Sequence, residues 1–132
     1  MKVSTKGRYA LRIMIDIAQN GKDDYVSTKS ISERQNISNK YIEQIISKLL
    51  KSGLLITRRG HTGGYKLSRE PKDYKVGEIL SAAEGDIIVT ECIHGFECPR
   101  KVGCNTYSFW KGLDTVIREY ANSYTLEELL KR

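Results

Sequence analysis

The stretch from Ser38 to Gly53 has the clearest helical pattern in the chain and constrains its fold most. Apolar residues recur there three and four positions apart, which places them in one stripe along a helix. The stripe consists of Ile42, Ile45, Ile46, Leu49 and Leu50. Ser38 suits the start of this helix and Gly53 its end. The opposite face is polar and carries Asn39, Lys40, Glu43, Gln44, Ser47, Lys48 and Lys51. The pattern therefore predicts a helix with one buried side and one polar side.

A shorter helix is expected just before this one. Its start is open, because Ser27 or Thr28 can cap it, and Ser30 and Glu33 also have the spacing of a capping box. It should stop near Asn36, which leaves a short connection to the next helix. Two helices joined in this way fit a helix-turn-helix.

Two β-prone runs follow, residues 54–57 and 65–67, on either side of a glycine-rich turn that contains Arg58 and Arg59. This pattern predicts a β-hairpin, which directly after a helix-turn-helix would be a wing. Arginines at its tip would suit a narrow minor groove, where the negative potential is strongest. Alternatively, the glycines only permit the turn and the arginines are solvated. The position after a helix-turn-helix favours DNA contact.

Basic residues are concentrated in the first half of the chain. Residues 1–70 carry 14 Lys and Arg against 6 Asp and Glu, a net charge of +8, whereas residues 71–132 carry 8 against 10, a net charge of −2. This imbalance is typical of a module that binds a polyanion, although a solvated basic surface would look the same. Pro71 therefore separates an expected DNA-binding domain, residues 1–70, which opens with a helix over residues 5–20, from a C-terminal part, residues 71–132.

Helical periodicity returns in the C-terminal part. A short amphipathic helix is expected over residues 76–83, and Thr125 and Glu128 have capping-box spacing for a last one. Between them, a helix over about residues 106–122 is apolar on much of its surface, with Phe109, Trp110, Leu113, Val116, Ile117 and Tyr120. Paired half-sites on DNA require a two-fold protein, so we expect this helix to form a homodimer. The alternative is that it folds back on its own domain. The expected fold is thus mainly α with a small β-hairpin: a winged helix-turn-helix plus a long C-terminal dimerisation helix.

The three cysteines of the chain, Cys92, Cys98 and Cys104, lie in one polar stretch, with five residues between each and the next. An iron–sulfur cluster is held by cysteine thiolates, usually four per cluster. Structural zinc favours close cysteine pairs, and none is present here. The wide spacing therefore favours a loop around a cluster. A redox thiol switch is the main rival, because basic groups nearby can lower the pKa of a cysteine.

Three thiolates leave the fourth ligand open. Candidates in the loop are His94, Tyr107, Asn105, Glu91 and Glu97. Imidazole is the best iron ligand among these groups. However, His94 follows Cys92 by only two residues, and a lone loop histidine is more often solvated.

Several motifs together resemble the iron–sulfur cluster regulator IscR and its relatives, which include the nitric-oxide sensor NsrR and the cysteine-metabolism repressor CymR. These motifs are Ser4–Ala10, Ile31–Gln35, Tyr41–Gln44, Gly63–Tyr65, Thr125–Leu126 and the Cys-x5-Cys-x5-Cys loop. The resemblance spans nearly the whole chain. It implies a homodimeric winged-helix transcription regulator that carries one 2Fe–2S cluster per subunit and binds a pseudo-palindromic promoter.

The resemblance also implies cluster ligands. Cys92, Cys98 and Cys104 would be the thiolates, and CymR-like members lack the full set. In IscR the fourth ligand is a His three positions after the third Cys, where this chain has Tyr107. In some NsrR members it is an Asp of the other subunit, at a position that corresponds to Arg8. The fourth ligand, and with it the signal that is sensed, is therefore not implied.

The same resemblance places the third helix in the major groove. Residues that match the family's DNA contacts are Ser38, Lys40, Tyr41, Glu43 and Gln44, with Arg59 in the minor groove. The chemistry agrees, because Glu43 can accept from a cytosine amino group and Gln44 can pair with adenine. Lys40, Lys48 and Arg8 are phosphate candidates.

We therefore expect a DNA-binding regulator that senses iron–sulfur or redox status. A nitric-oxide sensor, a cysteine-metabolism repressor and a zinc or thiol-switch regulator remain alternatives. An iron–sulfur electron carrier is disfavoured, because it needs no basic helix-turn-helix. An enzyme is not expected, since His61 and His94 show no nucleophile–base arrangement and no phosphate-binding glycine loop is present. The sequence contains neither a long apolar run nor a signal-like N-terminus, so we expect no membrane partner and a cytoplasmic location.

Overall fold

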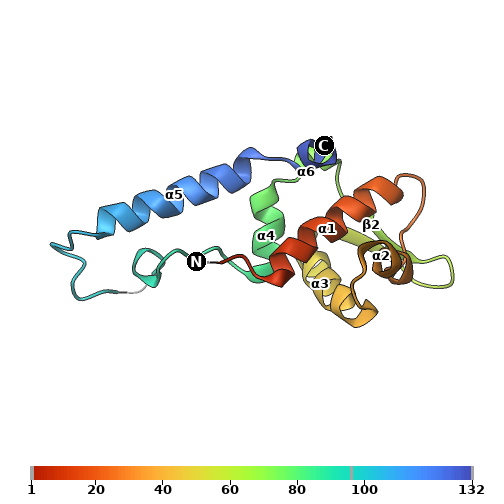
Figure 1. The fold of residues 1–132 in the computed structure, drawn as a ribbon, viewed down its shortest axis with the longest axis horizontal. Helices are drawn as coiled ribbons and strands as arrows, with labels where there is room; N and C mark the ends of the chain where they lie inside the picture. The colour runs from red at the N-terminus through yellow and green to blue at the C-terminus, as the bar shows by residue number, and fades with distance from the viewer. Residues whose placement is uncertain (1, 96, 132) are drawn as a thin grey trace.

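The computed structural model describes residues 2–95 and 97–131, and the expected fold class is confirmed in them (Figure 1). Helices dominate, and the described strands form one antiparallel hairpin. The elements in order are α1 Thr5–Asn20, α2 Thr28–Gln35, α3 Asn39–Lys51, β1 Leu55–Arg58, β2 Gly64–Leu67, η1 Pro71–Asp73, α4 Val76–Glu84, η2 Glu91–Ile93, α5 Tyr107–Ser123 and α6 Leu126–Leu130. None of the described helices is long and apolar enough to cross a membrane.

Hydroxyl side chains set the starts of the helices. Ser27 caps α2 by accepting from the backbone N–H of Ser30, which settles the open choice at this start. Ser38 caps α3, and Thr125 forms the predicted capping box with Glu128. The turn between α2 and α3 contains Asn36 at φ 55°, the left-handed region that asparagine tolerates better than most residues.

The hairpin has the expected position after α3. Leu55 pairs with Leu67 and Arg58 with Gly64. A Cβ at Gly64 (φ +151°) would lie 2.3 Å from the Val26 carbonyl oxygen, so only glycine fits this approach. The close contact lets β2 add Val26 as an isolated bridge partner of Tyr65, which ties the hairpin to the loop before α2.

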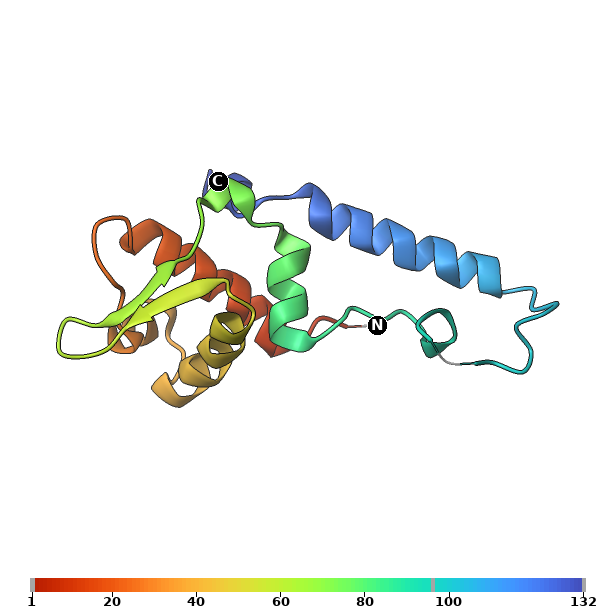
Figure 2. The same cartoon turned by 180° about the vertical axis from the view of Figure 1, so that it is seen from behind.

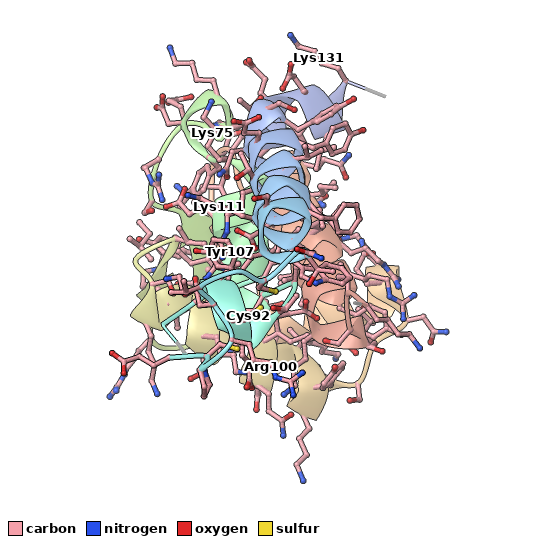
Figure 3. All side chains as sticks on the ribbon, turned by 90° about the vertical axis from the view of Figure 1, so that its left-hand side faces the viewer. Lys75, Cys92, Arg100, Tyr107, Lys111 and Lys131 are labelled. Atoms are coloured by element: carbon pink, nitrogen blue, oxygen red, sulfur yellow. The ribbon has the colours of Figure 1, made fainter. Side chains whose placement is uncertain are left out.

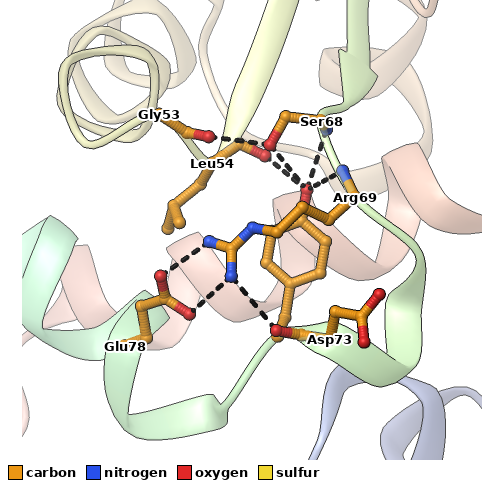
Figure 4. A network of polar contacts seen from close by, with 7 residues as sticks. Gly53, Leu54, Ser68, Arg69, Asp73 and Glu78 are labelled. Carbon is orange, nitrogen blue, oxygen red and sulfur yellow. Dashed lines mark hydrogen bonds and ion pairs between the residues drawn. The ribbon is translucent and has the colours of Figure 1, made fainter.

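One hydrophobic core joins both halves of the chain. It takes buried side chains from α1, α2 and α3, and also Tyr74, Ile79, Ala83 and Leu126 from beyond Pro71. The Tyr74 hydroxyl donates to the Leu54 carbonyl (2.7 Å) and accepts from the backbone of Ser68 and Arg69, so the base of the hairpin is fastened to the segment before α4. The Arg69 guanidinium lies over the Tyr74 ring and pairs with Glu78 of α4 (Figure 4).

The α5 helix leaves this body and carries the cysteine loop at its far end (Figures 1 and 2). The chain just after α5 is held to the start of α4 by a backbone bond from Val76 N–H to the Tyr124 carbonyl (2.9 Å). A second backbone bond, from Leu126 N–H of α6 to the Tyr74 carbonyl (3.1 Å), holds the same connection to the segment before α4. Gly77 lets α5 approach, since a Cβ there would meet the Asn122 side chain at 2.2 Å. No apolar side chain of α5 is fully buried within this chain; Phe109, Val116 and Tyr120 are exposed, and the one buried residue of α5 is Asp114.

Candidate nucleic-acid interface and metal centre

The helix α3 has the polar face that the sequence predicts, and this face lines a groove. Lys40, Glu43 and Gln44 are exposed, and Tyr41 is half-buried. Lys6, from the first turn of α1, lines the same groove. Sequence reasoning missed Lys6, although its position beside the expected phosphate contact Arg8 was a signal for it. The groove therefore combines polar groups that can bond to base edges with basic groups that can bind phosphates.

Three residues expected at the DNA also have partners within the chain. The Ser38 hydroxyl accepts from the Tyr41 backbone N–H (3.2 Å) as the cap of α3. The Tyr41 ring packs edge-on against Tyr9 at 5.7 Å, and the Arg12 guanidinium covers the Tyr9 ring. Arg8 is exposed and donates to the Thr5 hydroxyl at 3.3 Å. The contacts of Ser38 and Tyr41 hold the first turn of α3 in place beside α1.

A buried carboxylate joins α1 to α2. Asp16 is only 1% exposed and accepts two hydrogen bonds from Arg34, at 2.9 and 2.7 Å, and one from Gln35 at 2.9 Å. Arg12 donates in turn to the Gln35 side chain (3.1 Å) and to its carbonyl oxygen. The hydrogen bonds that Arg34 donates to the Asp16 carboxylate raise the pKa of Arg34. Sequence reasoning missed this pair, whose signal was an acid between Ile13 and Ile17 on the apolar side of α1.

The two wing arginines differ in their surroundings. Arg58 donates to Asp24 (2.8 Å) and to the Thr62 carbonyl (2.6 Å), and it lies over the Tyr25 ring at 4.3 Å. The Tyr25 backbone N–H and then Arg58 lower the pKa of Asp24. Arg59 is exposed next to the tip of the wing. Arg59 is therefore accessible to solvent, whereas Arg58 holds the wing to the loop before α2.

The three cysteines are free thiols: Cys92 lies in η2, and Cys98 and Cys104 lie on the loop between η2 and α5. Cys92 and Cys98 are half-buried, and Cys104 is exposed. The Cys92 sulfur lies 2.6 Å from the Thr90 hydroxyl. The Thr106 hydroxyl, 3.4 Å from the Cys104 sulfur, lowers the pKa of that thiol. Cys92 and Tyr107 are labelled in Figure 3, which views α5 end-on. Within residues 2–95 and 97–131, no three His, Cys, Asp or Glu side chains are close enough together to hold a metal ion.

His94, a candidate for the fourth ligand, is bound to α5. Its Nε2 lies 2.9 Å from Asp114, whose other carboxylate oxygen accepts from Arg118 at 2.9 Å. The Arg118 guanidinium also lies 3.3 Å from Nε2. Because the Asp114 carboxylate only accepts, a proton on Nε2 would complete that contact and leave Nδ1 as the nitrogen that could bind a metal. Burial opposes ionisation of Asp114, but the hydrogen bonds from His94 and Arg118 outweigh it and lower its pKa. Metal-binding histidines commonly donate their second N–H to a carboxylate in this way.

The second candidate, Tyr107, is the first residue of α5. It is half-buried, and the Lys101 amino group lies 5.2 Å from its ring centroid. Sequence reasoning singled out both candidates but missed Asp114 and Arg118, which their i, i+4 spacing on a helix could have indicated. The donor set fits a 2Fe–2S cluster in kind, since three free thiols and an oriented imidazole are soft or borderline ligands that iron accepts.

Comparison with known proteins gives the same family as the motifs. The family model Rrf2, described as an iron-dependent transcriptional regulator, matches residues 3–132. The HTH-type transcriptional regulator IscR of Vibrio atlanticus (strain LGP32) is 40% identical over 131 residues, which cover 99% of this chain and 76% of the relative. The IscR of Aliivibrio salmonicida (strain LFI1238) is also 40% identical, over 98% of this chain and 77% of the relative. These relatives are named as transcriptional regulators, not enzymes.

Solved structures agree. The structure of T. potens IscR has a TM-score of 0.78 and 42% identity, covering 99% of this chain and 87% of that one. CymR, the global cysteine regulator of B. subtilis, has a TM-score of 0.79 and 36% identity, covering 99% and 97%. The resemblance drawn from the motifs is confirmed. The chain belongs to the Rrf2 family of transcriptional regulators.

Proposed function

We propose that this DNA-binding regulator senses iron–sulfur or redox status through a 2Fe–2S cluster held by Cys92, Cys98 and Cys104. One observation carries the proposal: the same chain has an α3 helix with a polar, exposed face and three free thiols within one short segment. When bound, the cluster supplies a one-electron redox centre and links three points of the loop. Of the two candidates for the fourth ligand, the Asp114 hydrogen bond favours His94 over Tyr107.

We assign DNA contacts by what each side chain can reach. Glu43 and Gln44 would read base edges, with Tyr41 and Ser38 setting the position of α3. Lys40 and Arg8 would bind phosphates, and Arg59 would enter the minor groove. Lys48 and Arg58 belong to the same proposal, but each already has a partner within the protein, which reduces the gain from contacting DNA.

We also propose that α5 forms a homodimer. Leu113 is half-buried, and Phe109, Val116 and Tyr120 are 62%, 61% and 67% exposed. These four residues are spaced four, three and four apart, which is the seam of a coiled coil. Pairing two copies of α5 would bury this seam and place two α3 helices on a pseudo-palindrome. Residues 1–70 would then contact DNA, while residues 71–132 hold the cluster and the dimer. A regulator that binds chromosomal DNA would act in the cytoplasm.

Anaerobic purification followed by an absorption spectrum and iron, sulfide and zinc analysis tests the cluster. We expect a coloured protein with about two irons and two sulfides per chain. The Cys92→Ala variant should lose both colour and iron, and Cys98→Ala and Cys104→Ala should do the same. A colourless wild type, or a Cys92→Ala variant with an unchanged spectrum, would contradict the proposal.

A thiol switch is the second candidate. It is favoured by the exposed Cys104, whose pKa is lowered by Thr106, and by the likeness to a cysteine regulator. Metal-free wild-type protein whose DNA affinity changes on mild oxidation, but not after Cys104→Ser, would support the switch. Zinc in the metal analysis would instead indicate a zinc-stapled regulator. Nitric oxide and cysteine status remain possible signals of the same loop, and exposing the loaded protein to each distinguishes them.

A further inference from the structure

The C-terminal end of α4 contacts α1 and α3, the two helices that line the groove beside the polar face of α3. The Ala83 carbonyl accepts a hydrogen bond from the Lys48 amino group of α3 at 3.3 Å. Glu84 Oε1 accepts from the backbone N–H groups of Ser4 (2.6 Å) and Gly7 (3.2 Å), and from the Ser4 hydroxyl. Two residues of α4 thus hold α3 and the first turn of α1 at once.

These contacts suit the charges and the space available. The first amides of a helix lack partners within it and carry partial positive charge, so the Glu84 carboxylate stabilises the start of α1. The Lys48 ammonium matches the negative C-terminal end of α4 in the same way. A Cβ at Gly7 would lie 2.8 Å from Glu84 Cδ, so the absence of a side chain there lets the carboxylate approach.

Hydrogen bonds also connect the end of α4 to the cysteine loop. Beyond Gly85, the Ile87 carbonyl accepts from Arg118 of α5 at 2.9 Å. Arg118 binds Asp114, and Asp114 binds His94, which lies in the same loop as Cys92. A continuous path of named contacts therefore runs from the cysteine loop, across α5, to the chain segment that begins at Glu84. Energetic coupling between distant sites is carried by such networks.

We propose that Glu84 is a positioning residue that transmits the state of the cysteine loop to α1 and α3. The inference rests on the proposed function, since a cluster must come and go for the link to transmit anything. Closing the loop around a cluster would move the Arg118 and Ile87 contact, and with it the end of α4. Glu84 and Lys48 would then shift the first turn of α1 relative to α3 and change how the groove fits DNA.

The test compares wild type with Glu84→Gln, which keeps the shape and removes the charge. The matched control is Glu127→Gln, the same change at an exposed glutamate of α6. The DNA probe is the duplex that wild-type protein enriches most from a random pool. Its Kd is measured with cluster-loaded and cluster-free protein, together with the visible spectrum and the Tm of each variant.

We expect a ratio of the two wild-type Kd values of about tenfold or more, typical of coupled sites. In Glu84→Gln the ratio of the two Kd values should fall to within about twofold of one, which is below the roughly fivefold effect of weakly coupled sites. The visible spectrum of this variant should stay unchanged. Glu127→Gln should keep the wild-type ratio. A role in stability alone would lower Tm or weaken both Kd values equally and keep the ratio, which would overturn the inference.

A wild-type protein with equal Kd values in both states would contradict the proposed function itself, and the link would fall with it. If wild type has different Kd values in the two states and Glu84→Gln keeps the same ratio, the role of Glu84 would be overturned but the proposed function would stand. Gly7→Ala gives an independent check, because its methyl group would displace the Glu84 carboxylate. The ratio of the two Kd values should fall in this variant too. An unchanged ratio in both variants counts against the inference.

Discussion

At the residue scale, single polar side chains decide how the helix-turn-helix is held. Asp16 is the clearest case, because its carboxylate is buried and accepts hydrogen bonds from two residues of α2. Helical periodicity could place Asp16 among the core positions of α1, but it could not identify Arg34 as the partner. That pairing depends on the angle between α1 and α2, which is a property of the packed structure.

Asp16→Asn should destabilise the fold by about 2 kcal/mol, since hydrogen bonds to charged groups are worth about 1.5–3 kcal/mol each and Arg34 remains partly solvated. Urea unfolding measures the loss, with Asp23→Asn in the exposed loop after α1 as the control. A loss equal to that of the control would show that the Arg34 contact contributes nothing.

The residues of the α3 face should divide into two roles. Lys40→Ala should weaken binding to every duplex and flatten the dependence of log K on log salt by about one unit. Glu43→Ala should instead reduce the preference between matched and mismatched sites. Fluorescence anisotropy over a range of salt concentrations checks both, with Lys72→Ala as a distant control. Equal scaling of all affinities by both variants would contradict this division.

At the element scale, the sequence predicted the helices and the hairpin closely. Residues 5–20 were expected as the first helix and form α1, and the capping box at Thr125 is present. These successes have a local cause, because caps and periodicity act over a few residues. The short helix η2 at Glu91–Ile93 was missed, since the Thr90 cap there stands in a stretch without helical period.

The wing offers a prediction at this scale. Arg59→Ala should weaken DNA binding about tenfold, equivalent to about 1.4 kcal/mol, without changing the free protein. Arg58→Ala should instead loosen the wing, since Arg58 bonds Asp24 and Thr62 within the chain. Anisotropy gives the first effect, and hydrogen exchange of the β1 and β2 amides gives the second. Swapped effects would show that Arg58 is the arginine that faces DNA.

Acid should loosen the same contact. The pKa of Asp24 is lowered in the folded protein by the Tyr25 backbone N–H and by Arg58. A lowered carboxylate pKa contributes stability above the unfolded value, which is lost as the pH falls through the folded value. Exchange of wing amides should therefore increase, relative to unstructured references, only below about pH 4. Asp24→Asn should remove this pH dependence, and its persistence in that variant would assign it to another group.

At the scale of the whole molecule, α5 is the element that the single chain leaves incomplete. Its cysteine loop lies far from α3, so the proposed signal would have to travel through the protein to reach DNA (Figure 1). Motifs predicted both ends of that route. The spacing of Asp114 and Arg118 could indicate that pair, but the contacts of His94 with Asp114, of Arg118 with Ile87 and of Glu84 with Gly7 join residues far apart in sequence and could not be predicted from local patterns.

The exposed seam of α5 gives the prediction for assembly. Val116→Glu should convert a dimer to a monomer, because it places a charge in the proposed seam, and should weaken DNA binding by more than tenfold through loss of the second half-site. Sedimentation and anisotropy measure the two effects. Thr115→Glu, on the neighbouring exposed face, should leave the dimer intact. A monomeric wild type, or a dimeric Val116→Glu variant, would contradict the seam.

The most direct test of the account is selection of duplexes from a random pool by cluster-loaded and by cluster-free protein. We predict that pseudo-palindromic sites are enriched, and that cluster-loaded and cluster-free protein differ in which sites they select or in how tightly they bind them. The Cys92→Ala protein should select the cluster-free set under all conditions. Enrichment of the same sites with equal affinity in both states would show that the cysteine loop does not control DNA binding, and no enrichment in either state would contradict the DNA-binding role proposed for α3 and the wing.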